Sequence, residues 1–169
     1  MNPSLVIGPI LSSNVGASVD IARQILSRKM LATPHTCMNV VDVRDVAEGI
    51  VRAMESAEAT GERIVLSESG VWINDLSHAA RPVFMPLGYN PPRYNIPSPL
   101  LKAISWVVPS LRSMSGSTGV FYEFDNTKAK TVLGMHFMGY QESFVDMCHS
   151  IIQHGLVEKT PKYKEWEKA

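Results

Sequence analysis

The chain has 169 residues, of which 45% are hydrophobic and 19% are charged; this composition allows one folded domain with its own core and excludes wholesale disorder. The formal net charge is zero, so charge gives no reason to expect nucleic acid or a membrane as a partner. The two cysteines, Cys37 and Cys148, stand in no metal-ligand spacing, and no leader segment is visible, so we expect free thiols and a cytoplasmic location.

The first apolar run covers residues 5–7 (Leu-Val-Ile) and is closed by Gly8-Pro9. A short unbroken run of this kind is typical of a strand buried on both faces of a parallel sheet. Such a strand needs neighbours at both edges, and nothing precedes it here. We therefore expect the chain to be the C-terminal part of a larger enzyme, beginning at one of its central strands.

The next segments alternate between helix and strand. Helical spacing of apolar residues predicts a helix over 19–30, with Asn14 or Ser18 as its N-cap. A second strand is expected over 38–43, and it passes directly into a helix over 46–57. The apolar face of this helix is expected to consist of Ala47, Ile50, Val51 and Met54.

Two acidic residues, Asp42 and Asp45, stand at the junction between this strand and this helix. Paired carboxylates can do acid–base chemistry. At a strand-to-helix junction they more often cap the helix and interact with its dipole, and we favour that interpretation.

A third strand is expected over 63–67, followed by a helix that contains Trp72 and ends at Pro82. Six prolines between positions 82 and 99 predict an irregular crossing with one short extended piece over 93–96.

The last third of the chain is expected to hold three helices and one strand. The helices are predicted over 100–108, 126–134 and 141–154, and the strand over 121–125. The Ser/Gly-rich segment 110–119 is predicted to be mobile. Short strands alternate with helices throughout, so the predicted class is α/β. The charged tail at 158–169 is expected to fray.

Catalytic signatures are scarce. The chain has no G-x-G-x-x-G or Walker phosphate loop and no G-x-S-x-G serine. Its five histidines do not stand in metal-ligand spacing, so we expect no metal site.

Six segments, in the same order and at roughly the same spacing, resemble extended short-chain dehydrogenases/reductases, within the NAD-dependent epimerase/dehydratase superfamily. Residues 2–9 resemble its N-P-x-x-V-x-G-P segment, residues 40–47 its V-x-V-x-D-V-A junction, and residues 61–67 its G-E-R-Y-x-x-S strand. The branch of dihydroflavonol reductases and cinnamoyl-CoA reductases is indicated by similar segments at 94–97, 125–134 and 142–144.

The resemblance implies the C-terminal part of a Rossmann-type fold, with residues 1–157 as the substrate-binding portion and 158–169 as a charged tail. It implies NADP as the cofactor of the whole enzyme and a small-molecule carbonyl compound as its substrate. Because the N-P-x-x-V-x-G-P loop lies beside the nicotinamide in that family, the candidate cofactor contacts are Pro3, Ser4 and Leu5.

Two further positions are implied by the same resemblance. Ser18 matches a serine that contributes to the phosphate side of the cofactor in relatives, although a plain N-cap is an equal alternative. Asn39 matches a polar residue that contacts substrate in some relatives.

The family's catalytic Tyr-x-x-x-Lys is missing, because none of the five tyrosines has a lysine four residues later. We therefore assign no catalytic residue and expect the chain to be inactive alone. One alternative is a non-catalytic binding or dimerisation module, which would self-associate or aggregate through the exposed edge of the first strand. Another is a piece of a sterol- or sugar-nucleotide-acting relative.

Overall fold

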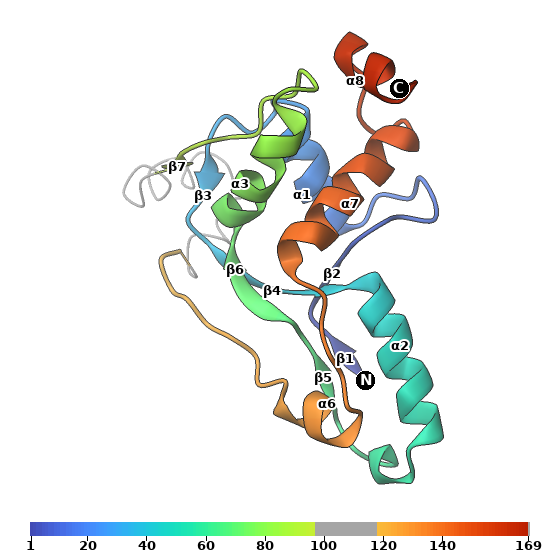
Figure 1. The fold of residues 1–169 in the computed structure, drawn as a ribbon. Helices are drawn as coiled ribbons and strands as arrows, with labels where there is room; N and C mark the ends of the chain where they lie inside the picture. Colours follow the sequence, from blue (N-terminus) through green and yellow to red (C-terminus); the bar gives the residue numbers. More distant parts are fainter. Residues whose placement is uncertain (97–117, 169) are drawn as a thin grey trace.

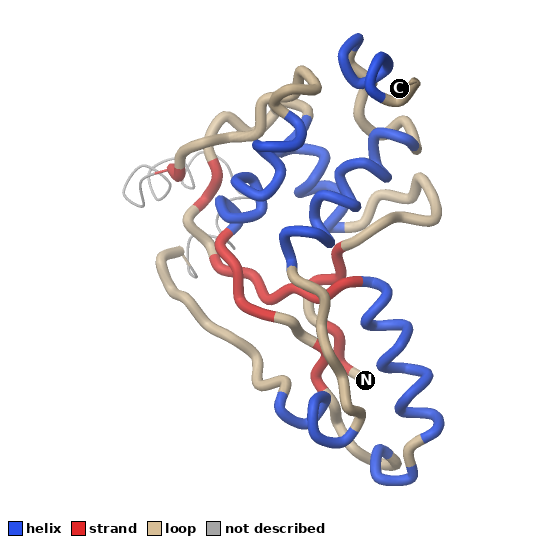
Figure 2. Tube along the Cα trace, viewed as in Figure 1, coloured by secondary structure: helices blue, strands red, loops and turns tan. Residues whose placement is uncertain are grey.

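The structure is a computed structural model that describes residues 1–96 and 118–168. The helix expected over 100–108 and most of the Ser/Gly-rich segment lie outside the described residues. Short strands cross the middle of the molecule, between an upper and a lower group of helices (Figures 1 and 2). The helices are α1 (Ala17–Leu26), α2 (Val43–Glu55), the short 3-10 turn η1 (Ala57–Ala59), α3 (Ile73–Phe84), α6 (Thr127–Val132), α7 (Tyr140–Gln153) and α8 (Pro161–Trp166).

Within residues 1–96 and 118–168, the strands form three small sheets. The strands are β1 (Asn2–Pro3), β2 (Leu5–Ile7), β3 (Thr33–Pro34), β4 (Cys37–Asp42), β5 (Val65–Leu66), β6 (Ser69–Trp72) and β7 (Asn95–Ile96). β1 pairs with β5, β2 with β4, and β3 with β7, all in parallel, while β4 and β6 are antiparallel. The predicted α/β class with short parallel strands is therefore confirmed.

Two hydrophobic cores lie on the two sides of these strands. The upper core joins α1, α3, α7 and α8 to the central sheet, and its largest fully buried side chains include Phe84, Phe144 and Tyr163. The lower core is smaller and joins α2 and α6 to β5, around Ile64 and Leu66.

The first apolar run is a strand, as predicted, but it is less enclosed than expected. β2 has β4 at one edge, and among the described residues no strand pairs with its other edge. Ile7 is buried, whereas Leu5 and Val6 are half-buried.

The start of α1 differs from the prediction. Gly16 is the N-cap, and no side chain caps the helix, so neither Asn14 nor Ser18 does so. Instead Asn14 lies in the exposed loop, where its backbone N–H faces the Ser12 hydroxyl at 3.5 Å. The loop geometry, which the local sequence did not reveal, places the helix start at Ala17.

The predicted apolar face of α2 is wrong. Val46, Gly49 and Ala53 turn toward the lower core, where a Cβ added to Gly49 would lie 2.9 Å from Leu66 Cδ1. The helix carries apolar residues on two flanks, and the smaller residues allow the close approach to β5. The predicted face, consisting of Ala47, Ile50, Val51 and Met54, is exposed.

Two boundaries were also wrong around α3. Trp72 ends the strand β6 rather than lying in a helix, because β6 pairs along β4 from Ser69 to Trp72. α3 continues past Pro82 to Phe84. A proline in the last turn removes one hydrogen bond, and the fully buried Phe84 side chain holds that turn in place.

The strand expected over 121–125 is not one, because this segment pairs with no strand in the described part of the chain. It lies instead across β4 and β6 as an extended loop. A Cβ added to Gly70 would lie 2.5 Å from the Tyr122 carbonyl oxygen, so Gly70 makes the close approach of this loop possible.

The tail does not fray as predicted. Thr160 caps α8 by accepting the Tyr163 N–H, and Pro161 takes the first helical position. Tyr163 is fully buried, and its hydroxyl lies 3.0 Å from His149 Nδ1 on α7, while Trp166 stacks on the same histidine ring. The prediction of fraying rested on the charged residues of the tail and overlooked Tyr163 and Trp166, which pack against His149.

This aromatic contact predicts an acid-sensitive tail. Burial lowers the pKa of His149 below its ordinary 6.5, and nearby Asp146 opposes that shift only in part. The contribution of His149 to stability is therefore complete above pH 6.5 and is lost as the pH falls through its folded-state value. We expect thermal unfolding to shift to lower temperature over this range in the natural protein, and His149→Phe to flatten that slope. An unchanged slope in His149→Phe would refute the assignment.

Candidate functional site

The candidate site lies where the first extended segment of the chain changes its pairing partner from β5 to β4. The chain pairs with β5 up to Pro3 and with β4 from Leu5, so Ser4 sits at the point of exchange. The Ser4 N–H still donates to the Leu66 carbonyl oxygen at 2.9 Å, which places Ser4 at the carboxyl end of the parallel pair β1–β5. Carboxyl ends of parallel strands are where α/β sheets bind their ligands.

Two buried hydroxyl groups at this end have no hydrogen-bond partner among the described residues. They are Ser4 Oγ and Ser67 Oγ, and Ser67 is only 1% exposed. The serines directly follow the register partners Pro3 and Leu66 on adjacent strands. An unpaired buried hydroxyl costs free energy, so two of them at one sheet end indicate a place where a polar ligand group would bind.

Asn39 lies on the neighbouring strand, directly before Val40, the register partner of Leu5. Three of the predicted site residues, Ser4, Leu5 and Asn39, are thus brought to adjacent strand positions. Asn39 is 4% exposed, its Nδ2 donates to the Tyr122 carbonyl oxygen at 3.1 Å, and its Oδ1 accepts the Phe124 N–H at 2.8 Å. Its observed role is to hold the 122–124 loop against β4, and its contact with substrate stays a prediction.

We expect Asn39→Ala to lower the free energy of unfolding by about 1–3 kcal/mol, because the Phe124 N–H loses its partner and the Tyr122 carbonyl oxygen keeps only the Cys37 thiol. Amide exchange at Phe124 should become faster at the same time. Chemical denaturation and hydrogen exchange measure both effects. The exposed Asn90→Ala is the control and should change neither. Unchanged exchange at Phe124 in Asn39→Ala would contradict the prediction.

Ser18 is not part of this group of strand residues. It is the second residue of α1 and is half-buried. The loop that leads to it is tied to α7, because Ile10 N–H donates to Ser150 Oγ at 3.0 Å. The role of Ser18 at the phosphate side of a cofactor stays a prediction.

A carboxylate network fixes the carboxyl end of β4 next to this site. Asp42 caps α2 by accepting the Arg44 N–H at 2.7 Å, and it also accepts from the Arg44 side chain at 2.9 Å and from the Ser143 hydroxyl on α7. Burial raises the pKa of Asp42, but hydrogen bonds from Arg44 and Ser143 outweigh burial, and the net pKa lies below its ordinary range. Asp45 accepts the Met138 N–H at 2.8 Å. The predicted capping role is therefore confirmed for Asp42, whereas Asp45 lies in the first turn of α2 and binds a different segment.

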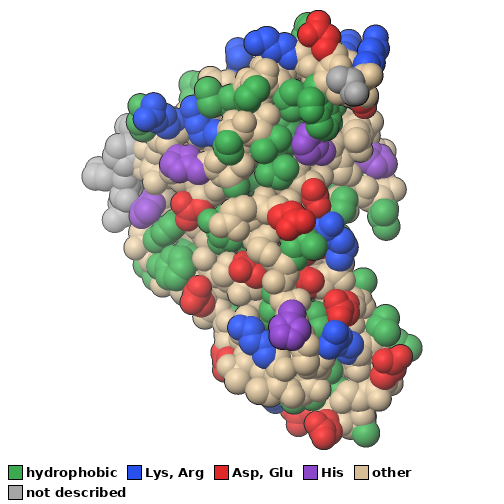
Figure 3. Space-filling model, in the orientation of Figure 1, with side chains coloured by type: hydrophobic (Ala, Val, Ile, Leu, Met, Phe, Trp, Pro, Cys, Tyr) green, Lys and Arg blue, Asp and Glu red, His purple; other side chains and the backbone are tan. Residues whose placement is uncertain are grey.

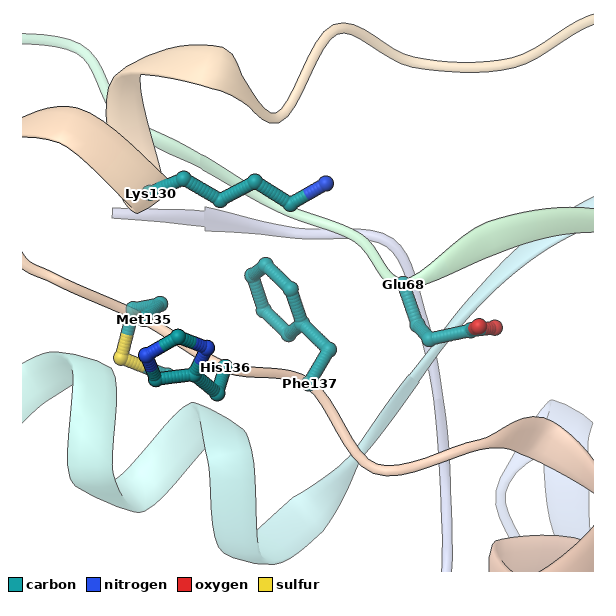
Figure 4. Close-up of a pocket in the computed structure, with 5 residues that line it drawn as sticks. All are labelled: Glu68, Lys130, Met135, His136 and Phe137. Atoms are coloured by element: carbon teal, nitrogen blue, oxygen red, sulfur yellow. The ribbon is translucent and has the colours of Figure 1, made fainter.

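Sequence patterns did not indicate a cavity of about 330 Å³ beside Ser67. It is lined by Glu68, Lys130, Met135, His136 and Phe137. In Figure 4 the Lys130 side chain extends from α6 past the Phe137 ring, and the Glu68 carboxylate points away from that ring, toward the side where it contacts the Ser69 hydroxyl. These residues come from three separated segments, so no local motif could have indicated them.

The residues at this end fit the NADP cofactor that the resemblance implies. The Ser4 and Ser67 hydroxyls are unpaired, Pro3 is exposed, and Leu5 packs against the upper core. Ser4 and Ser67 would hold a polar ring substituent. The pairing of β1 with β5 and of β2 with β4 fixes the backbone around Ser4.

Other classes of site find no support in the described part of the chain. No cluster of three or more His, Cys, Asp or Glu side chains there could hold a metal ion. No described helix is both long and apolar enough to cross a membrane.

No family model matches the chain. Two curated relatives are similar to it: a Synechocystis protein named as a dihydroflavonol 4-reductase is 27% identical over 175 residues, and cinnamoyl-CoA reductase 1 of Arabidopsis thaliana is 26% identical over 155 residues. The first match covers 94% of this chain and 49% of the relative, and the second covers 92% and 39%. The chain thus spans half or less of the length of these relatives.

Solved structures share the fold. The yeast methylglyoxal/isovaleraldehyde reductase Gre2, solved with NADPH, superposes with a TM-score of 0.67 at 23% identity, covering 91% of this chain and 42% of that one. A nucleoside-diphosphate-sugar epimerase from Pseudomonas aeruginosa gives a TM-score of 0.69 at 18% identity, covering 92% and 48%.

The fold is therefore that of the Rossmann-type extended short-chain dehydrogenases/reductases. In sequence, the chain is similar to a dihydroflavonol 4-reductase and a cinnamoyl-CoA reductase, which confirms the resemblance drawn from its motifs.

Proposed function

We propose that this chain forms the substrate side of an NADPH-dependent carbonyl reductase, and that the Gly-rich loop and the catalytic tyrosine and lysine come from a further segment. The observation that carries the proposal is the pair of buried, unpaired hydroxyls of Ser4 and Ser67 at the carboxyl end of β1–β5. Homology to reductases and the NADPH bound by a protein of the same fold support it.

Within such an enzyme, NADPH supplies a hydride to the carbonyl carbon of the substrate, and a proton from elsewhere completes the alcohol. The residues of this chain position the reactants. The Ser4 hydroxyl would hold the amide group of the nicotinamide, and the exposed Pro3 would lie beside the ring, while a contact of Leu5 stays a prediction. Asn39 holds the 122–124 loop, which limits access of water from that side.

A chimera tests the proposal. In it, the half of the Synechocystis relative that this chain does not match is fused before Met1. With a panel of aromatic and aliphatic aldehydes, we expect the chimera to consume NADPH and the isolated chain to consume none. Ser4→Ala should weaken NADPH binding to the chimera by about three- to tenfold, the value of one hydrogen bond. Ser12→Ala, on the exposed loop, is the control.

Two results would refute the proposal. One is turnover of NADPH by the isolated chain. The other is a folded chimera that binds NADPH but reduces no carbonyl compound. Equal NADPH affinity of the natural and Ser4→Ala chimeras would remove the role of Ser4 while leaving the reductase activity in place.

A non-catalytic binding module is the second candidate, and one observation favours it. The flank of α2 that carries Ile50, Val51 and Met54 is exposed, although apolar helix flanks usually pack against a neighbour. A chain that binds its partner through this flank without reducing carbonyls would fit this alternative.

A further inference from the structure

A cavity of about 300 Å³ lies on the upper part of the molecule, between the end of α1, the last turn of α3 and the loop that leads to β7. Three arginines line it, namely Arg28, Arg81 and Arg93, and no Asp or Glu is among the described residues around it. Figure 3 shows Lys and Arg side chains gathered at the upper left, where this loop runs. Guanidinium groups carry a fixed positive charge and only donate hydrogen bonds, so this arginine cavity suits an anion.

The three arginines are not neutralised by neighbouring carboxylates. Within residues 1–96 and 118–168, no ion pair involves any of them. Arg28 also borders a second cavity, of about 380 Å³, which Glu158 lines, but these two side chains do not pair. Helix C-termini attract cations, which accounts for Arg28 just beyond α1 and for Arg81 in the last turn of α3. Arg93 follows no helix end, so the helix dipoles do not account for the whole set.

The loop that carries Arg93 and Tyr94 is firmly held by its neighbours. Each carbonyl oxygen of residues 91–94 lies within hydrogen-bond distance of a donor on α3 or β3; in the order of the carbonyls, the donors are Arg81 Nη1, Ser77 Oγ, His78 Nε2 and the Thr33 N–H. The Arg93 guanidinium carbon also lies 5.6 Å from the centre of the Tyr94 ring. Two exposed side chains, one cationic and one aromatic, are thus presented from a fixed backbone, which lowers the entropic cost of binding a ligand.

Arg28 has an unusual backbone conformation for its residue type. Its φ is +58°, and no other described residue except glycine has a positive φ. The position just beyond a helix end normally belongs to glycine, because a Cβ is strained in the left-handed region. Such strain is typical of residues whose side chain has a role in binding. Arg28 therefore points to a ligand more strongly than an arginine in relaxed backbone would.

We propose that the arginine cavity binds a small phosphate monoester that has an apolar or aromatic part. The guanidinium groups of Arg28 and Arg93 donate to the phosphate oxygens, since guanidinium and phosphate match in charge and geometry. Arg81 adds positive charge while one of its nitrogens holds the Pro91 carbonyl oxygen.

Apolar side chains beside the arginines fit the organic part of such a ligand. Met30 is half-buried, whereas Leu31 is 87% and Tyr94 67% exposed, and all three line the arginine cavity. The volume is at the small end of the range for small-molecule sites. The net charge of the chain is zero, so there is no long-range attraction for a polyanion. A small molecule is therefore favoured over a nucleic acid or a membrane.

This inference does not rest on the proposed function. None of the residues that line the arginine cavity belongs to the group around Ser4, Ser67 and Asn39. Binding of a phosphate monoester there could thus be found in a chain that takes part in no carbonyl reduction, and a reductase could lack it.

The test titrates the full chain with phenyl phosphate, inorganic phosphate and phenol, and follows amide resonances by NMR. We expect phenyl phosphate to bind with a dissociation constant of about 1 mM or below and to shift the resonances of 28–31 and 93–95. Inorganic phosphate should bind about tenfold more weakly, and phenol should not bind measurably. Added salt should weaken the binding of phenyl phosphate, because exposed charges are screened.

Two substitutions separate binding from folding. Arg28→Gly removes the guanidinium group and relieves the strain at the positive φ, so stability should stay equal or rise while the affinity for phenyl phosphate falls about three- to tenfold. Arg93→Ala should lower the affinity by a similar factor. The matched control is Arg63→Ala, which removes the same charge from an exposed arginine outside the arginine cavity and should leave the affinity unchanged.

Three results would overturn the inference. The first is equal affinity for phenyl phosphate in the natural chain, Arg28→Gly and Arg93→Ala. The second is the same loss of affinity in Arg63→Ala, which would reduce the effect to net charge. The third is binding of vesicles made of phosphatidylcholine and phosphatidic acid in equal parts, without binding of phenyl phosphate, which would make the arginines a membrane contact instead.

Discussion

Asp42→Ala is expected to lower the free energy of unfolding by about 2–4 kcal/mol, because α2 loses its N-cap and a buried hydroxyl group loses its partner. The Asp42 side chain is fully buried, caps α2, and links the carboxyl end of β4 to Ser143 on α7 and to Arg44. Its loss leaves the Ser143 hydroxyl unpaired in the interior. Chemical denaturation followed by circular dichroism measures the effect.

The control for this prediction is Asp146→Asn. Asp146 binds the same Arg44 at 2.8 Å, but both side chains are well exposed, so its replacement should cost about 1 kcal/mol or less. Equal losses of stability in the two variants would show that the contacts of Asp42 with the start of α2 and with Ser143 do not stabilise the strand-to-helix junction.

The pH dependence follows from the same contacts. Because the folded-state pKa of Asp42 is lowered, its contribution is complete above its ordinary value of 3.8 and is lost as the pH falls through the folded-state value. Asp45 acts in the opposite sense, since burial raises its pKa. The comparison should therefore be made between the natural protein and Asp42→Asn, where we expect the acid-side slope to be shallower.

Gly8→Ala is expected to cost about 3 kcal/mol, from a disfavoured backbone conformation together with a steric conflict. Gly8 has a φ of +109°, and an added Cβ would lie 2.9 Å from Asp42 Oδ2 and 3.1 Å from Val43 Cγ1. The substitution therefore pushes against the same carboxylate that caps α2. In the chimera, NADPH binding should weaken as well, because Gly8 and Ser4 adjoin the two ends of the short strand β2.

Gly61→Ala separates the two causes. Gly61 also has a positive φ, of +78°, but nothing lies within 4 Å of an added Cβ. Its replacement should cost about 1 kcal/mol from backbone strain only. Equal losses in the two variants would show that the contact with Asp42 contributes nothing.

The local sequence was enough to predict those elements that depend on only a few adjacent residues. The apolar run at Leu5–Ile7, the acidic cap at Asp42 and the stop of α7 at Gly155 each depend on a few adjacent residues, and the structure has all three. The similarity to reductases could likewise be recognised from the sequence, because each of the motifs that indicate it is a contiguous segment.

The sequence could not decide which apolar flank of α2 packs inward, since both flanks carry apolar residues. The small Gly49 settles the choice only because Leu66 lies opposite it, 17 positions later in the chain. The tail was misjudged for a similar reason, because the buried Tyr163 packs against His149 on α7 and against Tyr89, which follows α3.

For the candidate site, the sequence alone supplied the class of protein and the positions Pro3, Ser4, Leu5, Ser18 and Asn39. Tertiary structure decided that Ser4 meets Ser67 at the end of a parallel pair, that the Asn39 amide is engaged by a loop some 80 residues away, and that Ser18 lies apart on α1. The physical reason is that hydrogen-bond partners and burial are set by contacts between distant segments, which no local pattern encodes.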